Sequence, residues 1–284
     1  MAIGKSIRIY LPSGSINGIR HAEIVNWTGQ AISCPRNLFK GLKDWPEATK
    51  PGIYFLFGVD DDGHNQVAYI GEAENVHERL KNHITNKDFW NEVVFFTSKD
   101  ENLTKSHVKY LESILITKAI EVARYELQNS VSPNSPTLPM ADRDAMTEFS
   151  ENVRTLLGAL GHKLLEPYTL LTKDDAGGQV VADKLRLLNK NTYGSRVSDG
   201  FLVYAGSEMA VKQAESLTEG KMALRQQLID DEIVQLVGNV YKLQKDWLFN
   251  SPSAAADTLH GYPTNGLDAW KGADGKSLKE LETV

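Results

Sequence analysis

Five side chains in the first half of the sequence have the chemistry that hydrolysis of a phosphodiester requires. They are two tyrosines, an arginine, a histidine and a glutamate: Tyr54, Tyr69, Arg79, His83 and Glu112. A guanidinium offers a planar fork of donors to phosphate oxygens, an imidazole can relay a proton, and a carboxylate can hold a divalent cation. A tyrosine can take a proton from water if nearby positive charge lowers its pKa. The set predicts phosphodiester hydrolysis, provided that the fold brings these side chains together.

The two tyrosines are predicted to lie on the two arms of a β-hairpin. Residues 52–59 and 66–70 are apolar, aromatic runs of strand length. The Asp-rich residues 60–63 between them end in glycine, which is typical of a turn between two strands. Tyr54 and Tyr69 can therefore face each other across the ladder.

A helix is predicted over residues 72–84, directly after the hairpin. Val76, Leu80 and Ile84 recur at helical spacing, and Arg79 and His83, also four residues apart, lie beside this apolar stripe on one edge. Their guanidinium and imidazole would then reach the same small volume. A pair of solvated surface side chains is the alternative, and the position directly after the hairpin favours the functional interpretation.

A carboxylate is predicted on the core face of the next helix. Residues 89–97 favour a third strand and residues 104–123 a longer helix, in which Glu112 lies on the apolar face between Val108 and Leu115. A carboxylate in such a position is unfavourable unless it is paired or binds a metal. A salt bridge to a neighbouring cation is the alternative. The predicted hairpin and Arg79 upstream favour a metal ligand.

The tripeptides Gly52-Ile53-Tyr54 and Tyr69-Ile70-Gly71, with the arginine, histidine and glutamate that follow them, resemble the GIY-YIG nuclease family from about residue 52 to residue 129. The resemblance implies this catalytic set: Tyr54, Tyr69, Arg79, His83, Glu112 and Asn129, with Asn134 as a second candidate for the last position. It implies that one tyrosine activates the attacking water, for which Tyr54 is our choice. The arginine would contact the scissile phosphate, and a histidine at position 83 is similar to the restriction-enzyme branch.

The same resemblance implies a metal-dependent DNA endonuclease of restriction, defence or mobile-element type, with repair as a further option. Glu112 would hold one Mg²⁺ or Mn²⁺ per active site, and the products would carry a 5′-phosphate and a 3′-hydroxyl. Since one site cuts one strand, double-strand cleavage predicts a homodimer or sequential nicking. The alternative is a catalytically inactive module of the same fold that binds nucleic acid or protein.

The composition fits a chain of more than one domain in the cytoplasm. The 284 residues are 41% hydrophobic and 24% charged, no apolar run approaches the length that spans a bilayer, and the first residues have no apolar signal core. The single cysteine excludes an intrachain disulfide and a cysteine-rich zinc site. No membrane partner is therefore expected.

Basic residues precede the acidic nuclease-like region. Residues 1–50 hold seven Lys or Arg against three Asp or Glu, whereas residues 51–130 hold eight against thirteen, and the net charge is −6. If DNA is the partner, contacts to phosphate should come from this leader, and we assign them to four residues: Arg8, Arg20, Arg36 and Lys40. Solvated surface charge is the alternative for each of them.

The chain is predicted to divide into four parts: residues 1–48, a basic leader with a β-hairpin and a short helix; 49–131, the nuclease domain; 132–192, a proline-rich linker with a bridging helix; and 193–284, a C-terminal module. The fold class is α+β, with a three-stranded mixed or antiparallel sheet flanked by helices and a second small α+β domain. The C-terminal module resembles a small domain of unknown function that is appended to such nucleases, through residues 251–256 (Ser-Pro-Ser-Ala-Ala-Ala) and the late Trp270. The same residues are similar to the RAMA domain of restriction-associated proteins, which is predicted to bind DNA. A helix cap at Ser251 explains the motif structurally as well.

Overall fold

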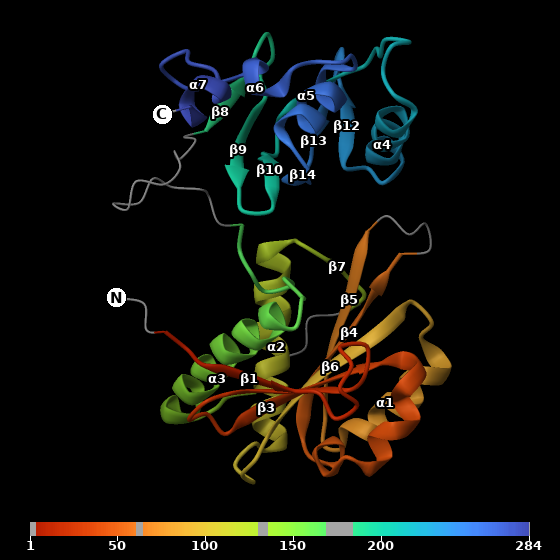
Figure 1. The fold of residues 1–284 in the computed structure, drawn as a ribbon, viewed down its shortest axis with the longest axis vertical. Coiled ribbons are helices and arrows are strands. Elements are labelled where there is room, and N and C mark those ends of the chain that lie inside the picture. Colours follow the sequence, from red (N-terminus) through yellow and green to blue (C-terminus); the bar gives the residue numbers. More distant parts are fainter. Residues whose placement is uncertain (1–3, 61–64, 130–135, 169–183, 284) are drawn as a thin grey trace. The chain divides into compact units, whose positions relative to one another are not determined.

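The computed structural model describes residues 4–60, 65–129, 136–168 and 184–283. It divides the chain into two compact units, Met1–Pro167 and Tyr168–Val284, each with sheets and a hydrophobic core of its own (Figure 1). Both units mix helices with largely antiparallel sheets, so the predicted α+β class is confirmed. In the described part of the chain, no helix is long and apolar enough to cross a bilayer.

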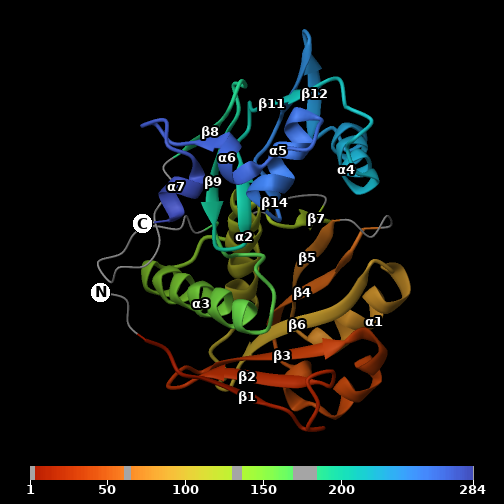
Figure 2. The same cartoon turned by 45° about the horizontal axis from the view of Figure 1, so that its top comes forward.

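One seven-stranded sheet forms the centre of the first unit, in the order β1-β2-β3-β6-β4-β5-β7 (Figure 2). Its strands are β1 (Ile7–Tyr10), β2 (Arg20–Ile24), β3 (Gly29–Pro35), β4 (Gly52–Val59), β5 (Gln66–Ala73), β6 (Trp90–Ser98) and β7 (Glu126–Leu127). Neighbours are antiparallel except β5 and β7, which are parallel. The predicted hairpin of residues 52–59 and 66–70 is therefore present as β4 and β5.

Helices cover both faces of this sheet. They are the 3-10 helices η1 (Arg36–Asp44) and η2 (Pro46–Thr49) and the α-helices α1 (Val76–Asn86), α2 (Lys105–Val122) and α3 (Met140–Ala159). Apolar side chains of η1, η2 and α1 share one core with Tyr54 and Leu56, whereas those of α2 and α3 share the other core with Ile53, Phe55 and Phe57. Since β4 is covered on both sides, it is apolar at successive positions rather than at alternate ones.

The sheet is larger than the three-stranded one predicted for residues 49–131. Strand β3 pairs with β6 over seven residues, so β1, β2 and β3 extend the same sheet and residues 1–48 are not a separate leader. The predicted bridging helix, α3, packs its Phe149 and Leu156 into the core beneath the sheet, which places it in the first unit as well. The sequence-based division missed the placement of these strands and of α3. Alternation and helical periodicity show that one face of an element is buried, but they do not show which other element covers that face.

The second unit contains two antiparallel sheets, in the orders β14-β10-β9-β8-β15 and β11-β13-β12. The strands are β8 (Leu185–Leu187), β9 (Tyr193–Val197), β10 (Gly200–Val203), β11 (Glu208–Ala210), β12 (Val234–Val237), β13 (Val240–Leu243), β14 (Trp247–Phe249) and β15 (Trp270–Lys271). The helices are α4 (Glu219–Asp230), α5 (Pro252–His260), α6 (Gly266–Ala269) and α7 (Leu278–Glu282). Strand β8 belongs to this unit, so the unit begins before the predicted boundary at residue 193.

The Ser-Pro-Ser-Ala-Ala-Ala motif has a structural role in the second unit. The Ser251 hydroxyl accepts a hydrogen bond from the Ala254 amide at 3.1 Å and caps α5, and Pro252 occupies the first turn. The Trp270 indole N–H donates to the Pro252 carbonyl at 3.0 Å, and the ring is completely buried. The motif and the late tryptophan therefore hold one another in place.

Candidate active site

The two motif tyrosines lie on the face of the sheet that α1 covers. Tyr54 is opposite Gly71 and Leu56 is opposite Tyr69 in the β4-β5 ladder, and the two phenol rings are 6.2 Å apart between centroids. Gly71 is required here because a Cβ at that position would lie 2.3 Å from the Tyr54 hydroxyl oxygen. The glycine of the second tripeptide therefore makes room for the tyrosine of the first.

Helix α1 places Arg79 and His83 against Tyr54. The Tyr54 Oη lies 2.7 Å from His83 Nε2, and Arg79 Nε donates to the same oxygen at 3.3 Å. Burial, Arg79 and Lys87 lower the pKa of His83 to about 4. The imidazole is therefore neutral at pH 7 and can accept a hydrogen bond from the Tyr54 hydroxyl.

Tyr54 itself is a poor proton acceptor in this position. Its side chain is completely buried, and burial, together with Tyr69, raises its pKa well above the ordinary value, although Arg79 opposes the shift. Tyr69 is half-buried, and the Lys87 ammonium lies 4.3 Å from its ring centroid. Both tyrosines thus have a cation beside them, Arg79 for Tyr54 and Lys87 for Tyr69, and Tyr69 is the one that water can reach.

Glu112 comes from α2, on the opposite side of the sheet, and reaches the same place at the edge of β5. The backbone amide of Glu72 donates a hydrogen bond to the Glu112 carboxylate. Burial and the nearby carboxylate of Glu72 raise the pKa of Glu112 to about 7, against the opposing effects of Arg79 and Lys109. A salt bridge does not explain this carboxylate, because the positive charges around it fail to keep its pKa low.

Asn129 supports the edge of β5. Strand β7 pairs only with Val67 and Ala68, and beyond it the Asn129 amide continues the ladder: its oxygen accepts from the Ile70 N–H at 3.0 Å and its nitrogen donates to the Ile70 carbonyl at 2.7 Å. Both ends of the amide are thus bound to backbone, so Asn129 positions the strand between Tyr69 and Glu72. Asn134, the second candidate, lies outside the described residues.

Two residues of the site were not predicted from the sequence. Glu72 follows the second tripeptide directly, and Lys87 follows His83 by one helical turn. The spacing of Lys87 from Arg79 and His83 was a usable signal, since residues four apart share a helix face. Glu72 gave none, because the sequence placed it in the predicted helix of residues 72–84, whereas it belongs to β5.

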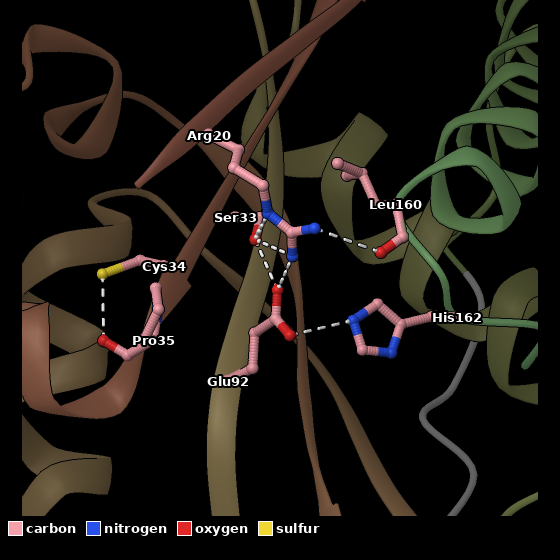
Figure 3. Close-up of polar contacts among 7 residues, drawn as sticks. All are labelled: Arg20, Ser33, Cys34, Pro35, Glu92, Leu160 and His162. Carbon is pink, nitrogen blue, oxygen red and sulfur yellow. Dashed lines mark hydrogen bonds and ion pairs between the residues drawn. The ribbon is translucent and has the colours of Figure 1, made fainter. Parts of the chain in front are cut away.

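Two of the four leader cations predicted to bind DNA are engaged inside the first unit. Figure 3 shows Arg20 between Ser33, Glu92 and Leu160: its guanidinium forms an ion pair with Glu92, donates to Ser33 Oγ at 2.7 Å and donates to the carbonyl of Leu160 at 3.4 Å. Arg36 donates to four backbone carbonyls between residues 84 and 90 and stacks on Trp90. The sequence did not indicate these internal contacts, because sequence charge does not show which cations the fold uses internally. Contact of Arg20 and Arg36 with phosphate stays a prediction.

The other two leader cations remain at the surface. Arg8 is largely exposed and forms a long ion pair with Glu23, at 3.8 Å, and Lys40 is exposed on η1. An exposed ion pair of this kind contributes little stability. Both side chains are therefore available to a phosphate, and neither lies among the residues of the candidate site.

The carboxylates at the β5 edge fit a hard divalent cation. Mg²⁺ and Mn²⁺ prefer oxygen ligands and are held in proteins by one or two carboxylates together with substrate oxygens. Glu112 and Glu72 supply such carboxylates, and the raised pKa of Glu112 indicates an uncompensated negative charge that a cation would relieve. Across the described residues, no group of three or more His, Cys, Asp and Glu side chains could hold a metal ion.

The second unit matches a known family. Residues 186–282 match the family described as Domain of unknown function (DUF4357), which confirms the predicted C-terminal domain of unknown function. The match begins within β8, which is the first strand of the second unit. No GIY-YIG family model matches the first unit, and no curated protein and no solved structure matches the chain.

Proposed function

We propose that the first unit is a metal-dependent DNA endonuclease that resembles the GIY-YIG family. The observation that carries the proposal is the convergence at one strand edge of Tyr54 from β4, Tyr69 from β5, Arg79 and His83 from α1, and Glu112 from α2. Four separate elements supply the chemical groups that phosphodiester hydrolysis needs. A purely structural cluster would not require a half-buried carboxylate with a raised pKa.

The geometry assigns different roles to the two tyrosines. Tyr54 is bound by His83 and Arg79 and positions them, so we place the proton acceptor at Tyr69. The sequence alone had suggested Tyr54 for this role. The Lys87 ammonium, 4.3 Å from the Tyr69 ring centroid, stabilises negative charge that develops on that side chain. Arg79 uses Nε for its hydrogen bond to the Tyr54 hydroxyl and also interacts with Tyr69. Its guanidinium therefore lies beside both tyrosines, where we place its contact with phosphate oxygens.

Glu112, with Glu72 beside it, would hold the Mg²⁺ or Mn²⁺ ion. When bound, such an ion polarises the phosphate and stabilises the leaving oxygen. The resemblance adds a product with a 5′-phosphate and 3′-hydroxyl, a restriction or mobile-element role, and a homodimer where both strands are cut.

A second candidate function is a binding module that keeps the fold without catalysis. It is favoured by the internal use of Arg20 and Arg36, which leaves Arg8 and Lys40 as the exposed members of the predicted phosphate-binding set. A protein that binds DNA strongly needs more clustered positive charge than this.

A plasmid-nicking assay with and without Mg²⁺ distinguishes the two. We expect the wild type to nick supercoiled DNA only with a divalent cation, and Glu112→Gln and Arg79→Lys to reduce the rate by about a hundredfold or more. Glu121→Gln is the matched control, because Glu121 is exposed near the end of the same helix as Glu112. If the wild type cuts no faster than Glu112→Gln, the nuclease proposal fails and the binding module remains.

A further inference from the structure

The first unit contains a cavity, away from the tyrosines, that the proposed function does not use. It has a volume of about 590 Å³ and lies between the turn that joins β2 to β3, the segment after β6, the start of α2 and the first turns of α3. Its described lining residues include four carboxylates and one histidine, and none of them is Lys or Arg. The cavity is therefore strongly biased towards a positively charged ligand.

The floor of the cavity is apolar and aromatic. It consists of Trp27 with Leu103, Met146 and Phe149, the last three of which are between 6% and 8% exposed. The rings of Trp27 and Phe149 are 4.8 Å apart between centroids at a tilt of 58°. Gly29 makes room for the indole, since a Cβ there would lie 2.2 Å from Trp27 Cζ2. A fully hydrated metal ion gains nothing from such a floor, whereas an aliphatic chain does.

The carboxylates at the rim differ in how far the fold already uses them. Asp100 accepts hydrogen bonds from Ser98 Oγ at 2.6 Å and from Asn102 Nδ2 at 3.0 Å, so it belongs to its own loop. Asp142 lies 3.8 Å from His107. Glu148 is exposed. Two carboxylates on α3 thus remain to contact a ligand.

We propose that this cavity binds a linear aliphatic diamine or polyamine. The methylene stem would lie on Trp27 and the neighbouring apolar floor, as the stems of long cationic side chains do, and the ammonium groups would pair with Asp142 and Glu148. These two residues are six positions apart, about 9 Å along the helix axis at 1.5 Å per residue, which matches amines separated by several methylenes. An ammonium near the indole face adds a cation–π contribution.

Isothermal titration calorimetry of the full chain with spermidine and with 1,6-diaminohexane tests the proposal, and the measurement needs no nuclease activity. We expect one site for each amine, and no binding of 1,6-hexanediol, which has the stem without the charge. Mg²⁺ is expected not to compete. Absence of a saturable site for either amine would overturn the proposal, as would displacement of both amines by Mg²⁺ at equal ionic strength.

Matched variants separate this cavity from general attraction to an acidic protein. Asp142→Asn with Glu148→Gln should weaken amine binding by about tenfold or more, whereas the control pair Asp144→Asn with Glu121→Gln, exposed positions that do not line the cavity, should change it by less than about twofold. Ala145→Arg, at an exposed lining position of α3, should fill the rim with a cation and abolish binding. Equal affinity in the two double variants refutes the site, and tighter binding of an arginine-rich peptide than of spermidine refutes the choice of ligand.

Discussion

The Glu112 carboxylate should destabilise the metal-free protein when it is ionised, so Glu112→Gln should increase stability at neutral pH while it removes activity. Most substitutions of partly buried side chains do the opposite. The increase follows from the position of Glu112, since burial and the carboxylate of Glu72 both oppose ionisation. A residue kept at a cost to stability is typical of a functional site.

The magnitude follows from the pKa. Folding raises the pKa of Glu112 from its ordinary value of 4.5 to about 7, which corresponds to about 3 kcal/mol at 1.36 kcal/mol per pH unit. Water reaches part of the carboxylate and reduces this to about 1–2 kcal/mol. Because the folded-state pKa is the higher one, the destabilisation is absent below pH 4.5, grows between pH 4.5 and pH 7, and is complete above that range.

Urea unfolding of the wild type and Glu112→Gln between pH 5 and pH 8, with a chelator present, measures this difference. We expect equal stability near pH 5 and a more stable variant at pH 8. Added Mg²⁺ should stabilise the wild type and leave the variant unchanged, since only a ligand of the folded state shifts the equilibrium. A pH-independent difference, or a less stable variant at pH 8, would refute the reasoning about Glu112. Glu121→Gln is the control: it should change neither the pH dependence of stability nor the response to Mg²⁺.

Three further outcomes are expected. Burial opposes the ionisation of Glu92, but contact with His162, the hydrogen bond from Ser33 and the charge of Arg20 outweigh it and lower the pKa of Glu92 to about 2. Glu92→Gln should therefore reduce stability at pH 7 by about 2–3 kcal/mol. Urea unfolding should show that the wild type loses this contribution between pH 4.5 and pH 2. Asn129→Ala removes two hydrogen bonds to the β5 backbone and should reduce stability by about 1–2 kcal/mol and slow nicking. Lys87→Met should slow nicking by about tenfold and change the free energy of unfolding by less than about 0.5 kcal/mol, measured by the same two assays.

Local patterns in the sequence predicted the individual elements well. The apolar runs predicted β4, β5 and β6, and the helical stripe of Val76 and Leu80 predicted α1. The predicted start of that helix at residue 72 was wrong, because β5 continues to Ala73 and α1 begins at Val76. Its N-terminus follows from Asn75, whose side chain accepts from the Glu78 amide at 3.0 Å. Strand pairing across long sequence separations was not predictable, because the register of β3 on β6 depends on two strands more than fifty residues apart.

The individual site residues were predicted more completely than their roles. Tyr54 and Glu112 were recognised by type and spacing, and the structure brings both to one strand edge. The amide of Asn129 bonds to the backbone of Ile70 and the guanidinium of Arg20 pairs with Glu92, contacts that the sequence did not indicate. A sequence shows which groups are present, whereas the hydrogen bonds that already satisfy them depend on the tertiary structure.

The edge of β5 explains why the site forms where it does. Alternate residues of this strand direct their backbone groups outward, and three of them find different partners: Ala68 bonds to the strand after α2, Ile70 to the Asn129 side chain, and Glu72 to the Glu112 carboxylate. The ladder of β7 therefore stops before the motif glycine, and the Asn129 amide continues it only as far as Ile70. A longer β7 would pair with this edge as far as Glu72, so the short strand and the Asn129 amide that replaces its continuation are what leave the Glu72 amide to the Glu112 carboxylate.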